Sequence, residues 1–179
     1  MSDNGGKPTL GAEIGVHRGE TSQKLLDAFP SLMLFMVDAW RGGIETDDPY
    51  YASGDGVARL SQVEQDANCE AAIRATTFGG MGARRTVLKL PSQKAAERVA
   101  GRSFCFVFVD AAHHYEAVRD DIAAWWPLVR SGGILAGHDY IHKKNKDGRF
   151  GVKRAVDEFV ATNGLQLNQL GSCWWAVKP

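Results

Sequence analysis

Residues 106–140, FVFVDAAHHYEAVRDDIAAWWPLVRSGGILAGHDY, decide the fold. The almost wholly apolar run 104–110 predicts a strand that is covered on both faces, as in a parallel sheet. Residues 115–129 predict an amphipathic helix, and residues 134–137 predict a second strand after a turn at Ser131–Gly133. A strand, a helix and a strand in succession favour two parallel strands joined by a right-handed crossover.

The same alternation of apolar runs and helical periodicity continues on both sides of this stretch. We predict further strands at residues 9–15, 32–38, 86–90, 165–170 and 173–177. We predict further helices at residues 20–29, 57–76, 92–100 and 152–162. A Gly-Ser turn joins the last two strands, which is typical of an antiparallel hairpin. The pattern predicts a three-layer α/β sandwich that spans residues 9–179 as one domain, after a disordered or extended N-terminus at residues 1–8.

The composition limits the class of protein. The chain has 179 residues, of which 44% are hydrophobic, so it can bury a core and is not globally disordered. Its 21 Lys and Arg residues balance 21 Asp and Glu residues, which argues against a dedicated nucleic-acid-binding protein. Three scattered cysteines form no disulfide framework. The sequence shows no signal peptide and no apolar run long enough to cross a membrane, so we expect a cytoplasmic protein.

Polar residues follow four of the predicted strands, at the edge where an open α/β sheet binds its ligands. They are Gly15, Asp38, Asp110 and His138–Asp139. Gly15 and Gly19 allow a tight turn before a helix, and Asp38 can accept hydrogen bonds from ribose hydroxyls. A dinucleotide fingerprint would need glycine where His17 and Glu20 stand, which disfavours the alternative of an NAD-binding oxidoreductase.

Residues 13–22, together with Val37–Asp38, resemble motifs I and II of class I S-adenosylmethionine-dependent methyltransferases. Residues 106–140 resemble the small O-methyltransferase-like group (methyltransferase family 24) with the signature DxxHxY…GGxxxGHDY, and residues 151–178 match that group too. The resemblance implies a Rossmann-like, mostly parallel seven-stranded sheet with strand order 3-2-1-4-5-7-6 and an antiparallel strand 7. It also implies methyl transfer from S-adenosylmethionine, and we expect O-methylation of a hydroxyl on a small molecule or sugar.

The resemblance also implies a set of residues that contact S-adenosylmethionine. They are Glu13, Gly15, Val16, His17, Gly19, Asp38, Ala39, Trp40, Ser92 and Asp110. In this set Glu13, Gly15 and Gly19 shape the pocket for the methionine part, and Asp38 holds the ribose. Ser92 lies beside the adenine in this interpretation, although a serine there also suits a plain helix N-cap. For His17 a structural role and a cofactor contact are equally consistent with the sequence, and we expect Trp40 to pack on the ligand.

The resemblance extends to metal-dependent O-methyltransferases that act on catechols and on macrolide sugars. It implies that Asp110 and Asp139 take part in catalysis by binding Mg²⁺ or Mn²⁺, and that His113 is the general base. His138 stands where relatives have an acidic residue, which leaves three options open: two carboxylates completed by water, a mixed site that includes His138, or no metal. A neutral hydroxyl is a poor nucleophile, so its methylation calls for groups that remove its proton.

Several other features leave their interpretation open. In a non-catalytic S-adenosylmethionine-binding domain, the glycines and Asp38 would keep their roles, and Asp110, His113 and Asp139 would have no chemical role.

The basic loop 143–154 predicts either a solvated surface or an entrance for an anionic acceptor. Zero net charge disfavours an RNA methyltransferase. Residues 41–56 and 140–150 are the available lids, so the site is either open to a large acceptor or closed by a second subunit in a homodimer. We expect His114 to face away from the site and His142 to lie on the surface.

Overall fold

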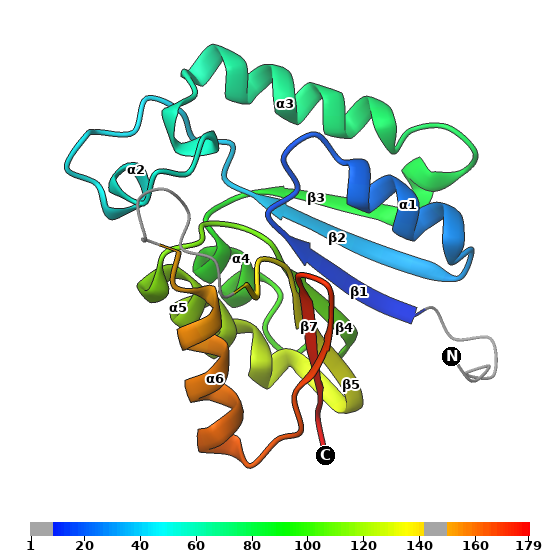
Figure 1. The fold of residues 1–179 in the computed structure, drawn as a ribbon. Helices are drawn as coiled ribbons and strands as arrows, with labels where there is room; N and C mark the ends of the chain where they lie inside the picture. Colours follow the sequence, from blue (N-terminus) through cyan, green and yellow to red (C-terminus); the bar gives the residue numbers. More distant parts are fainter. Residues whose placement is uncertain (1–8, 142–149) are drawn as a thin grey trace.

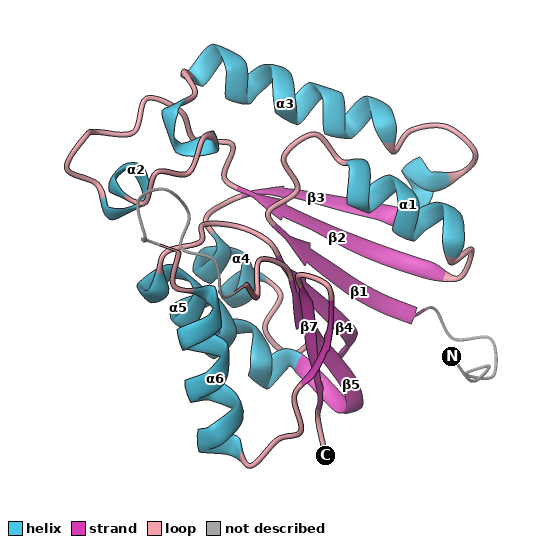
Figure 2. Cartoon of the chain, viewed as in Figure 1, coloured by secondary structure: helices cyan, strands magenta, loops and turns pink. Residues whose placement is uncertain are grey.

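The computed structural model describes residues 9–141 and 150–179, and these form a seven-stranded sheet with helices on both faces (Figures 1 and 2). The strands are β1 (Thr9–Ile14), β2 (Leu32–Asp38), β3 (Arg85–Lys89), β4 (Phe104–Val109), β5 (Val129–Gly137), β6 (Asn168–Leu170) and β7 (Cys173–Val177). Their spatial order is β3-β2-β1-β4-β5-β7-β6. Strands β1 to β5 pair in parallel, and β7 pairs antiparallel with both β5 and β6. The predicted Rossmann-like fold class and strand order are confirmed.

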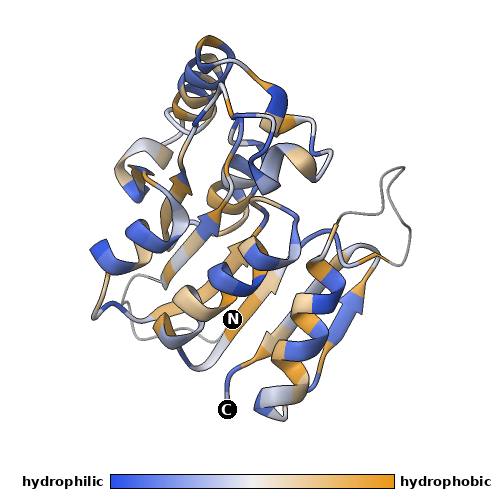
Figure 3. Ribbon diagram, turned by 90° about the vertical axis from the view of Figure 1, so that its left-hand side faces the viewer, coloured by the Kyte–Doolittle hydropathy of each residue, from blue (hydrophilic) through white to orange (hydrophobic). Residues whose placement is uncertain are grey.

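The helices form the two outer layers of the sandwich. They are α1 (Glu20–Ala28), α2 (Pro49–Ala52), α3 (Gln62–Ala75), α4 (Ser92–Arg98), α5 (Tyr115–Trp125) and α6 (Val152–Asn163). Helices α1 and α3 cover one face of the sheet, and α4, α5 and α6 cover the other (Figure 1). In Figure 3 the helices carry hydrophilic and hydrophobic residues side by side, as expected when only one helix face meets the sheet.

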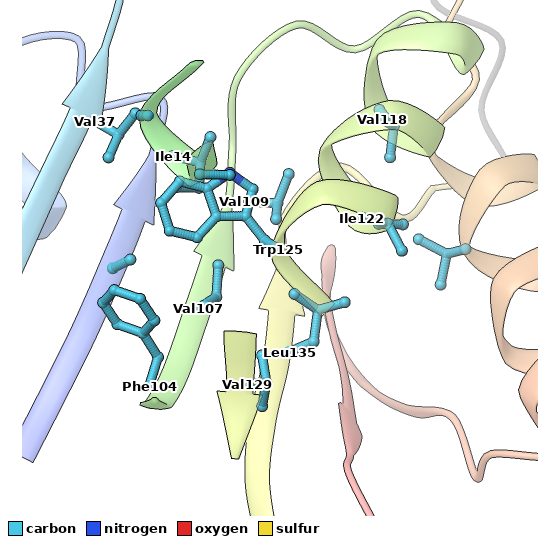
Figure 4. Close-up of a cluster of buried hydrophobic side chains, with 14 of the residues drawn as sticks. Ile14, Val37, Phe104, Val107, Val109, Val118, Ile122, Trp125, Val129 and Leu135 are labelled. Atoms are coloured by element: carbon cyan, nitrogen blue, oxygen red, sulfur yellow. The ribbon is translucent and has the colours of Figure 1, made fainter. Parts of the chain in front are cut away.

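Strand β2 shows how the sequence builds a core on each face. Successive side chains of a strand point to opposite faces, so Leu34 and Met36 pack under α1 and α3. Phe35 and Val37 point the other way, into the larger core under α4, α5 and α6. That larger core centres on Trp125 of α5, which is fully buried among strand residues such as Phe104 (Figure 4). Both faces of β2 are therefore buried, which explains its unbroken apolar run.

The structure corrects several predicted boundaries. The expected helix 57–76 is a short 3-10 turn at Val57–Arg59 followed by α3, which begins after a capping box formed by Ser61 and Glu64. The expected turn at Ser131–Gly133 is part of β5, where the positive φ of Gly132 accompanies a register shift against β4. The expected loop 41–56 contains the short helix α2.

Three sequence predictions fall wholly or mainly outside the described residues. They concern the disordered or extended N-terminus (residues 1–8), His142 and most of the basic loop 143–154. Of the loop's cations, Lys153 pairs with Asp157 and Arg154 pairs with Glu158 on α6. Within the described ranges, no helix combines the length and apolar character that a membrane crossing requires.

Candidate active site

A cavity of about 380 Å³ lies at the carboxyl ends of the parallel strands. Figure 1 shows the heads of the strand arrows pointing toward the side of the molecule that carries α2 and its loops. The cavity lining runs from the residues after β3, past the ends of β2 and β1, to the residues after β4: Leu90–Gln93, Val37–Ala39, Ile14–Gly15, His17 and Asp110–His114. The loop between β2 and α3 closes another side through Arg41, Ile44, Asp48, Tyr50, Asp55 and Val57. This is the sheet edge at which the sequence predicted a ligand.

The first wall of the cavity is the turn after β1, which the Asp38 carboxylate holds in place. One Asp38 oxygen accepts hydrogen bonds from the backbone N–H groups of Val16 and His17, both at 2.9 Å, and the other accepts from Trp40 N–H at 2.8 Å. Gly15 has φ 91°, and a Cβ on it would lie 2.1 Å from the carbonyl oxygen of Asp110. The turn therefore requires glycine, and it brings the loops after β1, β2 and β4 together.

The remaining predicted residues of this wall divide into two groups. Gly15, His17, Asp38 and Ala39 line the cavity, whereas Glu13, Val16, Gly19 and Trp40 lie behind it. Glu13 is 2% exposed and accepts a hydrogen bond from Ser22. Burial raises the pKa of the Glu13 carboxyl to about 8.

The position of Trp40 corrects the expectation that it packs on a ligand. Its side chain is 1% exposed and belongs to the core under α1 and α3. Its indole N–H donates a hydrogen bond of 2.8 Å to the carbonyl oxygen of His17. Trp40 therefore supports the His17 turn from the core, and His17 itself adopts the left-handed region at φ 51°.

The second wall contains Asp110 and His113 from the end of β4, and Asp139 from the end of β5 lies against them, outside the residues that line the cavity. Nε2 of His113 lies 3.0 Å from Oδ2 of Asp139 and 3.6 Å from Oδ1 of Asp110. This Nε2 is buried and makes no hydrogen bond with proper geometry in the described structure. One ligand atom from each of the three residues falls within a 4.8 Å cluster that suits a single metal ion. Two carboxylates and an imidazole are donors that Mn²⁺ and similar cations accept.

His113 is held on its other edge by Asp55, a residue that the sequence analysis missed. Nδ1 of His113 lies 2.7 Å from Oδ2 of Asp55, which is 5% exposed and comes from the loop between β2 and α3. The ring of Phe150 stacks on the imidazole with 4.6 Å between centroids. Burial by itself would lower the pKa of His113, but the contacts with Asp110, Asp139 and Asp55 outweigh burial and raise it to about 11. The contact with His113 in turn lowers the pKa of Asp139.

His138 lies beside this cluster and outside the group of three. Its Nε2 is 2.6 Å from the hydroxyl oxygen of Ser172, and its Nδ1 is 3.3 Å from Asp139 and 4.0 Å from Asp110. The compact donor set in the described residues thus takes its nitrogen from His113, whereas the mixed site among the three options that the sequence left open included His138.

The domain that contains the cavity matches a known protein family. A family model described as "Methyltransferase domain" matches residues 12–140, which include both walls of the cavity. The chain belongs to this methyltransferase family. The family implies S-adenosylmethionine as the methyl donor, and membership argues against the alternative of an NAD-binding oxidoreductase.

Solved structures share the fold at low sequence identity. The O-methyltransferase NovP superposes with a TM-score of 0.69 at 18% identity over 97% of this chain and 73% of NovP. CalS11, a calicheamicin methyltransferase, gives 0.68 at 15% identity over 95% of this chain and 72% of its own. Cofactor-bound Rv0187 from MTB gives 0.67 at 17% identity over 99% of this chain and 80% of its own. No curated protein sequence shows significant similarity to the chain.

The third part of the methyltransferase cavity contains two polar residues that the sequence did not single out. Ser92 lines the cavity, and the N-cap of α4 is Pro91, so Ser92 is not a plain helix cap. Gln93 and Asp121 line the cavity beside it, and Asp121 is 3% exposed. His114 also lines the cavity, which corrects the expectation that it faces away. Asp121 and Asp55 lie on a helix and in a loop, where no strand-end pattern marks them.

Proposed function

We propose that the chain is an S-adenosylmethionine-dependent O-methyltransferase that acts on a hydroxyl of a small molecule or sugar. The observation that supports this proposal best is the continuity of the cavity. It joins the Gly15–Asp38 turn, which suits a nucleoside, to Asp110 and His113, which suit removal of a proton. A domain that only binds S-adenosylmethionine would need the residues of the first wall, and Asp110 and His113 would then have no chemical role.

The residues of the first wall fit the methyl donor. A carboxylate has about four acceptor positions, and Asp38 uses three of them on backbone N–H groups. The fourth can accept a hydrogen bond from a ribose hydroxyl. Because Gly15 has no side chain, the turn after β1 lies directly against the backbone of Asp110, so a donor bound at the first wall would have its sulfonium end close to the second wall. When bound, S-adenosylmethionine supplies a methyl group on a positively charged sulfur.

The residues of the second wall fit a divalent cation and a base. We propose that Asp110 and Asp139 hold the cation and that Nε2 of His113, buried without a hydrogen bond, faces the acceptor hydroxyl. When bound, such a cation lowers the pKa of a hydroxyl and orients its oxygen. Asp110 and Asp139, two of the three carboxylates that raise the pKa of His113, are also the residues that would hold the cation. Carboxylates engaged by a cation would stabilise the protonated imidazole less, which would make Nε2 of His113 a better proton acceptor.

The proposed reaction is an in-line displacement. The acceptor oxygen forms a bond to the methyl carbon, and the carbon–sulfur bond breaks with its electron pair going to sulfur. The hydroxyl proton passes to Nε2 of His113. Asp55 keeps Nδ1 of the imidazole engaged, so that Nε2 is the nitrogen available to the substrate.

The test is methyl transfer from isotopically labelled S-adenosylmethionine to a panel of catechols, sugars and other hydroxylated small molecules. The assays contain Mg²⁺, Mn²⁺ or EDTA. We expect transfer to a hydroxyl that EDTA abolishes and that His113→Asn lowers about 100-fold or more in kcat, the range of general base catalysis. Binding of S-adenosylhomocysteine to the variant, measured by calorimetry, should stay within about twofold of wild type. Unchanged kcat in His113→Asn, or transfer only to nitrogen or sulfur acceptors, would contradict the proposal.

A further inference from the structure

The turn between β6 and β7 reaches the end of β5 and contacts the chain on both sides of Asp139. Gly171 turns the chain with φ 60°, and Ser172 follows it directly before β7 begins. The hydroxyl oxygen of Ser172 lies 2.6 Å from Nε2 of His138. The carbonyl oxygen of Ser172 accepts a hydrogen bond of 3.0 Å from the backbone N–H of Tyr140. Ser172 therefore holds the residue before Asp139 and the residue after it.

Asp139 is a residue whose conformation needs such support. Its φ of 56° is in the left-handed region, which a residue with a side chain keeps only when its surroundings hold it there. Its Oδ2 lies 3.0 Å from Nε2 of His113 and 3.3 Å from Nδ1 of His138. The reaction that we propose gives a role to His113 and leaves His138 and Ser172 without one.

The surroundings of His138 determine which of its ring nitrogens carries hydrogen. Its Nδ1 lies 3.3 Å from Asp139 and 4.0 Å from Asp110, and a carboxylate only accepts hydrogen bonds. A lone pair on Nδ1 would face two negative charges, so Nδ1 carries the hydrogen. The other nitrogen of a neutral imidazole is an acceptor, so the hydroxyl of Ser172 donates to Nε2. In this arrangement both nitrogens of His138 are engaged, and neither has a lone pair free for a cation.

We infer that His138 is a positioning residue of the cation site and not one of its ligands. Ser172 fixes the imidazole ring, and Nδ1–H of His138 holds the carboxylate of Asp139 where it faces Asp110. The inference rests on the proposed cation, and it excludes the mixed site that includes His138 from the options that the sequence left open. Partners that orient a metal ligand in this way change metal affinity by about 10–100-fold when they are removed.

The first test measures binding of Mn²⁺ alone, from the electron paramagnetic resonance signal of the free ion. Ser172→Ala and His138→Ala should each weaken Mn²⁺ binding about tenfold, the lower end of the range for such partners. The double variant should be no weaker than His138→Ala, because both residues act through one contact. Ser172→Thr keeps the hydroxyl and should restore the affinity. Ser131→Ala, which removes an exposed hydroxyl near the start of β5, is the matched control and should bind as wild type does.

The size of the two losses separates a positioning residue from a ligand. A ligand contributes more than the partner behind it, so a loss in His138→Ala far above the loss in Ser172→Ala overturns the inference. Unchanged Mn²⁺ affinity in Ser172→Ala overturns it as well. Each variant should still bind S-adenosylhomocysteine without a cation as wild type does, because Asp38 and its turn are intact, and this binding shows that the variant folds.

The second test reads the hydrogen positions on His138 directly in the cation-free protein. In ¹⁵N NMR spectra of the histidine rings, the signals that His138→Ala removes identify this residue. We expect a protonated Nδ1 and an unprotonated Nε2, whose signal shifts when Ser172→Ala removes its donor. A proton on Nε2 overturns the inference, because Ser172 would then accept a hydrogen bond and would not hold the ring as described. If wild type binds no Mn²⁺, the proposed cation fails first, and this spectrum alone decides whether Ser172 and His138 hold Asp139.

Discussion

At the scale of single residues, acidic side chains at the sheet edge hold the backbone as well as facing the cavity. Asp38 fixes two loops through three backbone N–H groups. Asp55 joins its own loop to His113 while accepting from the N–H of Val57 at 2.9 Å. Glu13, which lies behind the cavity, is more deeply buried than Asp55 and accepts a hydrogen bond from the side chain of Ser22 on α1. Their substitution is expected to change stability and ligand binding through different contacts.

Glu13 should make stability depend on pH. Its pKa in the folded protein, about 8, is above the ordinary value of 4.5, so the folded state binds the proton more tightly than the unfolded state. This contribution to stability is complete below pH 4.5 and is lost as pH rises to about 8. Between these values the free energy of unfolding of wild type should fall, relative to Glu13→Gln, by roughly 1.4 kcal/mol per pH unit.

The measurement is urea unfolding of both proteins from pH 5 to pH 8.5. Glu20→Gln removes an exposed carboxylate from the first turn of α1. Its free energy of unfolding should change with pH in parallel with that of wild type. Parallel curves for Glu13→Gln and wild type would show that Glu13 is not held protonated by its burial.

At the scale of elements, the turn between β1 and α1 depends on a glycine that admits no side chain. Gly15→Ala would place Cβ 2.1 Å from a backbone oxygen at φ 91°, and both the clash and the strain oppose folding. Gly164 ends α6 at φ 61°, and a Cβ there would meet no atom within 4 Å. We expect Gly164→Ala to cost about 1 kcal/mol and Gly15→Ala to cost about 2–4 kcal/mol. Equal costs by urea unfolding would contradict the close approach of the loops after β1 and β4.

The loop between β2 and α3 should depend on its attachment to His113. Asp55→Asn keeps the size of the side chain and removes its charge, and a hydrogen bond to a charged group is worth about 1.5–3 kcal/mol. We expect amide hydrogen exchange in residues 41–56 to accelerate roughly tenfold or more, with little change in the strands. Unaltered exchange in this loop would show that other contacts hold it.

The sequence predicts the elements that follow a period and misses contacts made across long separations. The apolar runs of β2 and β4 suffice to predict strands covered on both faces, because burial alone dictates their pattern. The Asp55–His113 contact spans 58 positions and depends on how a loop folds back over the sheet. The burial of Asp121 is equally hard to predict from the sequence, since it follows from packing of α5 against α4. The strand order came from family resemblance, because local patterns do not specify which strands are neighbours.

At the scale of the whole molecule, one edge of the sheet carries three groups of candidate functional residues. The β3 side carries Ser92 and Gln93, the centre carries Asp38, and the β4 and β5 ends carry Asp110 and Asp139. The two cores on opposite faces fix the strands and thereby the spacing of these groups. Of the candidate site, the sequence predicted the strand-end members and the resemblance supplied their roles. A large acceptor or a second subunit at the open side stays a prediction.

The measurement that tests the account most directly is calorimetric titration of the chain with S-adenosylhomocysteine, with and without Mg²⁺ or Mn²⁺. We predict binding in the micromolar range by wild type and by Asp47→Ala, which removes an exposed carboxylate from the loop before α2. Asp38→Ala should lose most of this affinity because the proposed ribose contact and the observed His17 turn both depend on that carboxylate. Absence of binding by wild type under every condition, or full affinity in Asp38→Ala, would contradict the central claim that this sheet edge holds the methyl donor.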